Sequence, residues 1–354
     1  MTNRIRYENV SKYYGDVCAV EDVSLTVREG EFLAVIGPSG AGKTTILRML
    51  AGFEKPSGGE IFLGEREITQ LPPHKRDTGM VFQDYALFPH MSVRENIAFG
   101  LKNEGLPKDE IEDRITEVLE MVDLPGFEDR KTTNLSGGQQ QRVATARALA
   151  IEPDVLLMDE PLGALDKKLR DQLEVKVIRL QKELGITTMY VTHNQEEALK
   201  MADRVAVMNQ GTIEQIDPPE KIYHEPATEF VADFIGDTNF IEGSVVKENG
   251  SSIVESDGTK IKANSTSVSD DAHIFVRPER MTIESEDYEG PGNAVPATID
   301  EVIFVGSKTQ YYVTALDSEF VIEIQNDGPT ANSFTEGEEV TVVWDEDDVG
   351  IVEG

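Results

Sequence analysis

The chain has 354 residues, with 66 acidic and 33 basic side chains and a formal net charge of −33 at neutral pH. Its length suggests two domains rather than one. So large an acidic excess argues against nucleic acid or an anionic membrane surface as a direct partner, because like charges repel. With no run of about 18 apolar residues and no apolar segment near Met1, we expect neither a membrane span nor a secretory signal. The single cysteine, Cys18, permits no internal disulfide bond, which suits a reducing cytosol.

Up to about residue 235, short β-branched runs alternate with helical periods. This pattern is typical of an α/β domain with a largely parallel sheet. Leucines and one valine that recur every three or four residues predict an amphipathic helix over 165–184. Buried strands are predicted at 32–36, 155–158, 187–191 and 205–208.

Beyond about residue 241, the runs become shorter and richer in β-branched and aromatic residues. They occupy 260–262, 273–276, 311–314 and 340–344. Turn signals such as Asn249-Gly250 and Asp327-Gly328 separate several of them. We therefore predict an α/β domain at 1–235 and an all-β domain, a small barrel, at 236–354.

Residues 37–44, Gly-Pro-Ser-Gly-Ala-Gly-Lys-Thr, match the phosphate-binding pattern G-x-x-x-x-G-K-[ST] completely. A predicted strand precedes the loop and a helix follows it, so backbone N–H groups and the helix dipole converge on phosphate oxygens. Lys43 is expected to reach the β- and γ-phosphates, and the Thr44 hydroxyl to ligate Mg²⁺. The predicted ATP-binding residues here are Gly37, Pro38, Ser39, Gly40, Ala41, Gly42, Lys43, Thr44 and Thr45.

Residues 155–160, Val-Leu-Leu-Met-Asp-Glu, form an apolar strand that ends in two carboxylates. Asp159 is placed to hold Mg²⁺, directly or through water. Glu160 can polarise the attacking water, a role worth about 10²–10⁴ in rate. A solvated loop would be the alternative, and the upstream phosphate loop favours the catalytic interpretation.

A second phosphate cradle is predicted where a serine and two glycines open a helix that continues to residue 150. Free N–H groups, the helix dipole and a hydroxyl then point to one place. An ordinary serine-capped helix would look similar in isolation. The position between the phosphate loop and the acidic strand favours the cradle. Its residues are Leu135, Ser136, Gly137, Gly138 and Gln139.

Together these motifs resemble the ATPase cassettes of ABC transporters. Residues 37–44 are similar to the Walker A motif, 135–139 to the signature, and 155–160 to the Walker B motif with its catalytic glutamate. The resemblance implies ATP and Mg²⁺ as cofactors and a helical subdomain at about 90–150. Relative to the common family pattern, Gly163 replaces a serine, and Asn194 stands where aspartate is frequent.

The resemblance also implies roles for single residues. Gln83 looks like the glutamine that senses Mg²⁺ and the membrane partner. His193 looks like the switch histidine that contacts the γ-phosphate and completes a catalytic set with Lys43 and Glu160. Asp166 looks like the aspartate at the dimer seam. Tyr14 looks like the aromatic that stacks on adenine, with Tyr13 as the alternative.

One chain carries one Walker A motif and one signature, whereas the family sandwiches ATP between two cassettes. The resemblance therefore implies a homodimer, bound as a peripheral subunit at the cytoplasmic face of the membrane to ABC permease subunits. An extracellular solute-binding protein would act indirectly, and no nucleic acid is expected. The permease's cytoplasmic helix is expected to dock at 82–88, where plain core packing is the alternative.

The second domain resembles the accessory TOBE-like, OB-like barrel of importers for sugars, polyamines, ferric iron, thiamine and oxyanions, most clearly at 275–279. Residues 230–243 look most like the spermidine/putrescine subgroup, so we favour a polyamine importer over the other solutes. A non-transport ABC ATPase acting on nucleic acid or ribosomes is a further alternative. It would usually bring a long heptad insertion or a second cassette, and neither is present.

The charge balance yields a first prediction. At molar salt the Debye length falls to about 3 Å, which removes most self-repulsion, so we expect a protein of an extreme halophile. Fold and ATP turnover should be kept as potassium chloride rises to molar levels. Circular dichroism and ATPase assays across a salt series would check this, and a loss of either at molar salt would contradict it.

Overall fold

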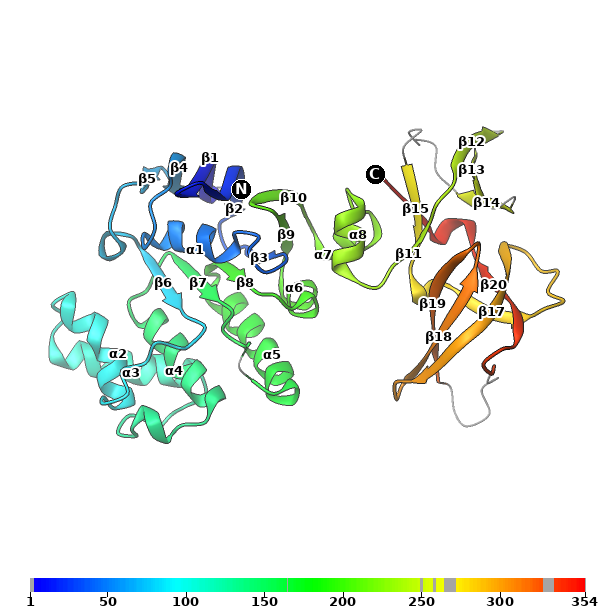
Figure 1. The fold of residues 1–354 in the computed structure, drawn as a ribbon. Coiled ribbons are helices and arrows are strands. Elements are labelled where there is room, and N and C mark those ends of the chain that lie inside the picture. Colours follow the sequence, from blue (N-terminus) through cyan, green and yellow to red (C-terminus); the bar gives the residue numbers. More distant parts are fainter. Residues whose placement is uncertain are drawn as a thin grey trace. The chain divides into compact units, whose positions relative to one another are not determined.

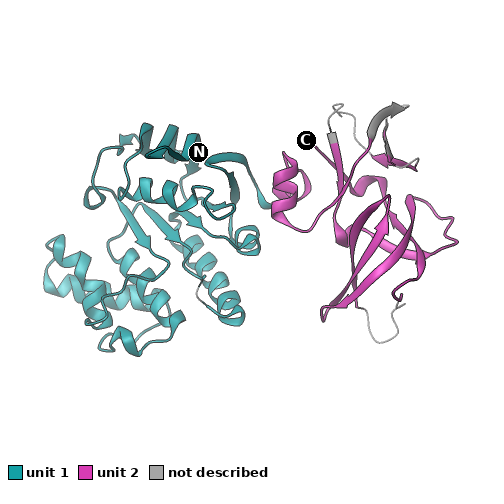
Figure 2. Ribbon diagram, in the orientation of Figure 1, with its two compact units in different colours: residues 1–219 teal, residues 220–354 magenta. Residues whose placement is uncertain are grey.

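The computed structural model divides the chain into two compact units, residues 1–219 and 220–354 (Figures 1 and 2). The sequence analysis placed this division at 235. In the structure, residues 220–235, which are largely helical, belong to the second unit. The structure describes residues 3–163, 165–248, 251–256, 259–263, 272–326 and 334–353.

A six-stranded sheet in the order β10-β9-β3-β8-β7-β6 forms the centre of the first unit (Figure 1). The five strands from β9 to β6 are parallel, and β10 is antiparallel at the edge. Every residue of β3, β7 and β8 is buried, as expected of parallel strands covered on both faces. The predicted α/β class and the four predicted strands are confirmed. The strands are β3 (Phe32–Ile36), β6 (Thr78–Val81), β7 (Val155–Asp159), β8 (Thr187–Val191), β9 (Arg204–Asn209) and β10 (Thr212–Asp217).

An antiparallel sheet in the order β2-β1-β4-β5 packs with helix α1 (Lys43–Ala51) and the parallel sheet around one hydrophobic core. Tyr7 of β1 is buried in this core and donates its hydroxyl hydrogen to the carbonyl of Ile46, 3.0 Å away in α1. These contacts fix the helix that starts at the phosphate loop. The strands are β1 (Asn3–Tyr14), β2 (Val17–Arg28), β4 (Gly58–Leu63) and β5 (Arg66–Glu67).

Three helices, α2 (Val93–Asn103), α3 (Lys108–Met121) and α4 (Gly137–Ala150), share a separate hydrophobic core. They occupy the range in which the helical subdomain was predicted. Helices α5 (Lys167–Leu184) and α6 (Gln195–Met201) flank β8 in sequence, and α5 ends at Gly185 in the left-handed conformation with φ +61°. Short 3₁₀ turns cover Pro73–Lys75 and Thr132–Asn134. No helix in the described part of the chain combines the length and apolar character needed to cross a lipid bilayer.

The second unit begins with two helices, α7 (Pro219–His224) and α8 (Glu229–Ile235), and is otherwise built from antiparallel strands. The strands form three sheets, ordered β11-β15-β21, β12-β13-β14 and β16-β20-β17-β18-β19. The predicted all-β character is confirmed, whereas the predicted turns at 249–250 and 327–328 lie outside the described residues. The strands are β11 (Asn239–Ile241), β12 (Ser244–Glu248), β13 (Ser251–Ser256), β14 (Thr259–Ala263), β15 (Ala272–Val276), β16 (Thr282–Ser285), β17 (Asn293–Phe304), β18 (Lys308–Ala315), β19 (Ser318–Gln325), β20 (Glu339–Trp344) and β21 (Val349–Glu353).

Arg277 explains why the two helices belong to the second unit. Its side chain follows β15, is only 4% exposed, and donates hydrogen bonds to the carbonyls of Ala232 at 2.9 Å and Gly236 at 3.1 Å. A further bond of 3.1 Å reaches the carbonyl of Tyr223, whose ring lies under the guanidinium at 4.4 Å. One buried cation therefore ties both helices to the sheets.

Replacing Arg277 tests this role. In Arg277→Met the apolar stem remains but the carbonyls lose their donors, so we expect the second unit to lose about 2–4 kcal/mol of stability. Trp344, the chain's one tryptophan, is 2% exposed in this unit, so its fluorescence during denaturant unfolding reports the change. Arg280→Met is the control, because half of that side chain is exposed and its ion pair to Asp348 spans 3.5 Å. Equal midpoints for the two variants would contradict this role.

Candidate nucleotide-binding site

Residues predicted to act on ATP follow the carboxyl ends of four strands that neighbour one another in the order β3-β8-β7-β6. Gly37 comes after β3, His193 after β8, Glu160 after β7 and Gln83 after β6. Ligands of open parallel sheets bind in the crevice outside these ends. Sheet topology thus gathers residues that lie far apart in sequence.

The phosphate loop between β3 and α1 depends on glycine at two tight points. A Cβ atom on Gly37, whose φ is +153°, would lie 2.2 Å from the carbonyl oxygen of Met208. A Cβ atom on Gly42, with φ +99°, would lie 2.4 Å from the carbonyl oxygen of Ala19. Only glycine allows this backbone path, which ends at the amino terminus of α1.

The side chain of Lys43 folds back onto the phosphate loop. Its Nζ donates to the carbonyls of Gly37 at 2.7 Å and Pro38 at 2.9 Å, and the residue is 7% exposed. Burial lowers the pKa of Lys43, while the carboxylates of Glu160 and Asp159 act in the opposite direction. A phosphate anion near Nζ would favour the charged form further, because opposite charges attract strongly in a partly buried site.

Thr44 and Asp159 meet across the site. The Thr44 hydroxyl donates to Oδ1 of Asp159 at 3.2 Å, and Asp159 is 6% exposed. Burial raises the pKa of Asp159, and the hydrogen bond from Thr44 opposes this shift. A hydroxyl and a carboxylate oxygen are ligand types that Mg²⁺ takes together with phosphate oxygens and water. The pair therefore fits the predicted ion.

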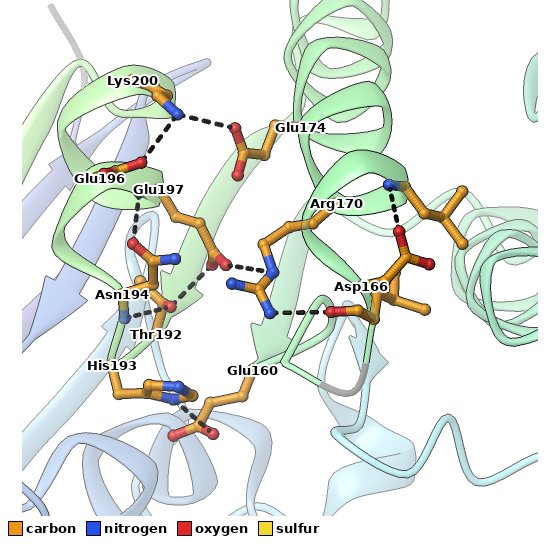
Figure 3. Close-up of polar contacts among 12 residues, drawn as sticks. Glu160, Asp166, Arg170, Glu174, Thr192, His193, Asn194, Glu196, Glu197 and Lys200 are labelled. Atoms are coloured by element: carbon orange, nitrogen blue, oxygen red, sulfur yellow. Dashed lines mark hydrogen bonds and ion pairs between the residues drawn. The ribbon is translucent and has the colours of Figure 1, made fainter. Parts of the chain in front are cut away.

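Glu160 joins two other predicted residues. Its Oε2 lies 3.1 Å from Nδ1 of His193 (Figure 3). The same oxygen accepts a hydrogen bond of 3.1 Å from Nε2 of Gln83. The backbone of Glu160 is left-handed, with φ +45°, and its N–H donates to the carbonyl of Val191 at 2.9 Å. Such strain in a non-glycine residue is typical of functional sites. Gln83 therefore contacts the Asp159–Glu160 pair through the side chain of Glu160.

The signature residues form the start of α4 rather than a wall of this site. Ser136 caps the helix by accepting a hydrogen bond of 3.4 Å from the N–H of Gln139, whose side chain accepts one of 3.0 Å from the N–H of Ser136. Within the described residues, no hydrogen bond joins 135–139 to 37–45. In this chain the capped start of α4 therefore lies apart from the phosphate loop, and its role as a second cradle stays a prediction.

Asp166 and the two tyrosines lie at the ends of elements. The carboxylate of Asp166 caps α5 by accepting a hydrogen bond of 3.1 Å from the N–H of Leu169. Tyr13 and Tyr14 end β1 and are 47% and 45% exposed. Nζ of Lys12 lies 4.8 Å from the centre of the Tyr14 ring. Both rings are therefore available for stacking.

Comparison with known proteins assigns the family. The ABC transporter family model matches residues 20–163, and the TOBE domain model matches 274–351. The spermidine/putrescine import ATP-binding protein of Rubrobacter xylanophilus is 48% identical over 348 residues, 96% of this chain and 91% of that protein. This chain belongs to the ABC transporter ATP-binding proteins. As an ABC ATPase, it hydrolyses ATP to drive transport.

Other relatives agree with this assignment. The spermidine/putrescine import ATP-binding protein of Acidothermus cellulolyticus is 46% identical and covers 97% of this ABC ATPase and 92% of its own length. The structure of cbiO1 from Clostridium perfringens, part of the ABC transporter complex cbiONQ, superposes with a TM-score of 0.59 at 32% identity, covering 64% of this chain and 92% of that one. A dimeric structure of the cassette MJ0796 with ADP and phosphate gives 0.54 at 32% identity, covering 61% and 98%.

Arg147 of the ABC ATPase was missed by the sequence reasoning. From α4 it donates to the carbonyl of Ala86 at 2.6 Å and to that of Tyr85 at 3.1 Å. Both recipients have left-handed backbones, with φ +45° and +61°. Burial lowers the pKa of Arg147, and Asp84 opposes this shift. A single arginine in a helix gives no sequence signal for such a contact, because its partners lie in a segment far away in sequence.

Proposed function

We propose that this ABC ATPase powers the uptake of a polyamine such as spermidine or putrescine. The observation that carries the proposal is the name shared by relatives that are 46–48% identical over nearly the whole chain, second unit included. Sugars, ferric iron, thiamine and oxyanions are the alternative solutes. They stay open to test because the solute passes through the membrane partner, so the residues of this chain need not touch it.

In the proposed mechanism, the N–H groups of 37–45 cradle the phosphates of ATP, and Lys43 moves from its carbonyl partners to the β- and γ-phosphates. Tyr14 stacks on adenine. Thr44, Asp159 and Gln83 would hold Mg²⁺, and the ion would neutralise charge on the phosphates. The fixed N–H dipoles of the loop are effective here, because they need no reorganisation during the reaction.

Glu160 is the proposed general base, and His193 contacts the γ-phosphate. In the structure, Oε2 of Glu160 is engaged at 3.1 Å with both Gln83 and His193. To polarise a water, Glu160 exchanges one of these contacts for the water. The histidine that it releases is then free to turn to the phosphate. This exchange couples nucleotide arrival to activation of the base.

A second copy of the chain completes the site in this proposal. Residues 135–139 present the N–H groups of α4 and the Ser136 hydroxyl to the γ-phosphate held by the partner, and Asp166 lies at the seam. The dimeric cassette MJ0796 supports such an arrangement. Because ATP bridges the copies, its hydrolysis releases them, which is a nucleotide-gated two-state device.

The permease is proposed to dock on an aromatic groove beside the ATP site. The groove holds about 430 Å³ and is lined by Phe53, Phe82, Phe88, Phe99 and Arg147 among others. Phe53 and Phe99 are 53% and 43% exposed, and an exposed apolar groove of this kind suits an amphipathic helix. This contact would hold the ATPase at the cytoplasmic face of the membrane, with a solute-binding protein acting from outside.

Glu160→Gln tests the catalytic and dimer roles together. The amide cannot act as a base, so we expect ATP turnover to fall about 10²–10⁴-fold while ATP binding remains. Trapped ATP should then hold a stable dimer, measured by light scattering after gel filtration. Lys43→Ala is the control that should bind ATP weakly and stay monomeric. Unchanged turnover would remove Glu160 from its role, and a folded, ATP-loaded variant that stays monomeric would contradict the sandwich.

Solute specificity is tested in proteoliposomes that contain the ATPase with its permease, together with the cognate binding protein. Spermidine or putrescine should raise ATP turnover several-fold, because the loaded binding protein favours closure of the dimer. Glu160→Gln complexes give the background. Stimulation by a sugar, ferric iron, thiamine or an oxyanion instead would replace the polyamine assignment, and stimulation by RNA or ribosomes without permease would overturn the importer.

A further inference from the structure

A buried acid on α6 lies behind the switch histidine and has no part in the mechanism above. Glu197 is 3% exposed, yet its Oε2 accepts a hydrogen bond of 2.8 Å from the Thr192 hydroxyl (Figure 3). A second bond of 2.8 Å comes from the Tyr190 hydroxyl. Burying a carboxylate is costly unless it is paired and hydrogen-bonded. We therefore expect the buried carboxylate of Glu197 to fix a defined local geometry.

The segment that Glu197 fixes is the turn that contains His193. Thr192 donates to Glu197 and also accepts a hydrogen bond of 3.0 Å from the N–H of Asn194. The side chain of Asn194 in turn accepts one of 3.2 Å from the N–H of Glu197, which caps α6. Both residues beside His193 are therefore fixed to the same buried acid.

Arg170 connects this acid to the segment before α5. Its Nε lies 3.6 Å from Oε1 of Glu197, and its Nη2 donates to the carbonyl of Leu165 at 2.9 Å (Figure 3). Leu165 directly precedes Asp166, whose carboxylate caps the helix from which Arg170 projects. One guanidinium thus bridges the seam segment and the acid that holds the histidine turn.

A simple structural tie between α5 and α6 is the alternative explanation. The same two helices are already joined by Lys200, whose Nζ lies 3.7 Å from Glu174 of α5 and 3.3 Å from Glu196 of α6 (Figure 3). That ion pair touches neither Leu165 nor Thr192. Removing the Lys200 side chain therefore serves as a matched control, because it weakens the junction between α5 and α6 without changing a contact of Leu165 or Thr192.

We propose that Arg170 and Glu197 are positioning residues through which contact of a partner copy at Asp166 sets the position of His193 against Glu160. The inference rests on the proposed dimer and on the proposed roles of these two residues. Coupling through this series of hydrogen bonds, joined by the Arg170–Glu197 ion pair, requires an element with two discrete states, and dimer closure supplies it. Arg170 then affects the rate of hydrolysis without touching ATP.

The test compares Arg170→Met with Lys200→Met in the full-length protein. Changes along coupling networks are worth about 0.5–2 kcal/mol, so Arg170→Met should lower kcat about 2- to 30-fold. Its KM for ATP should stay near the wild-type value, as should ATP-dependent dimerisation measured in the Glu160→Gln background. Lys200→Met should keep wild-type kcat. Equal losses in both variants, or a loss confined to KM, would overturn the proposal.

A double-mutant cycle separates transmission from local stability. If Arg170 transmits the state of Asp166, then Asp166→Ala already removes the signal, and adding Arg170→Met should cost little more. Independent structural effects would instead multiply. Should Arg170→Met fail to fold, Thr192→Val replaces it, because this near-isosteric change removes the bond to Glu197. Thr192→Ser keeps the hydroxyl and should retain kcat, and equal kcat in the Val and Ser variants would refute the linkage.

Failure of this inference can be told apart from failure of the proposed function. Glu160→Gln and His193→Ala at wild-type turnover would remove the catalytic roles on which the inference rests. If those variants lose turnover while Arg170→Met behaves as Lys200→Met does, the catalytic roles stand and only the coupling is wrong.

Discussion

The order of four parallel strands is the constraint on which the site depends. Because β3, β8, β7 and β6 lie side by side and end at one edge, the phosphate loop, His193, Glu160 and Gln83 meet there without any long loop to position them. Fully buried apolar strands fix this edge. Hydrophobic packing of the strands therefore sets the positions of the polar side chains. Short segments after the strands are enough to bring these side chains together.

Sequence predicted the parts of the fold that local pattern controls. Continuous apolar runs gave the central strands, and contiguous glycine-rich motifs gave the phosphate loop, whose glycines are sterically required. Arg147, Arg170 and Glu197 escaped notice because each is one charged residue on a helix, and only tertiary structure shows the polar partners of its side chain. The compact units divide at residue 219 and the predicted domains at 235, and the contacts of Arg277 that tie the intervening helices to the sheets carry no sequence signal.

Charged side chains in the described part of this protein include two kinds. Arg277 donates to main-chain carbonyls and holds neighbouring elements in one arrangement, so its role is complete within a single chain. Lys43 and Glu160 rest on partners that another group can replace, such as the carbonyl of Pro38 or the imidazole of His193. The first kind stabilises a fold, while the second holds reactive groups ready until a ligand displaces their present partners.

The contact of Arg147 with Tyr85 and Ala86 has a consequence for the direction of signalling. Arg147 lies near the end of the helix that Ser136 caps, so in the proposed dimer a displacement of the 82–88 segment would be passed along α4 to its amino-terminal end. In the proposed dimer that end faces the nucleotide of the other copy. Each half of the permease would then act on the ATP that is bound by the subunit it does not touch, so coupling would run in trans.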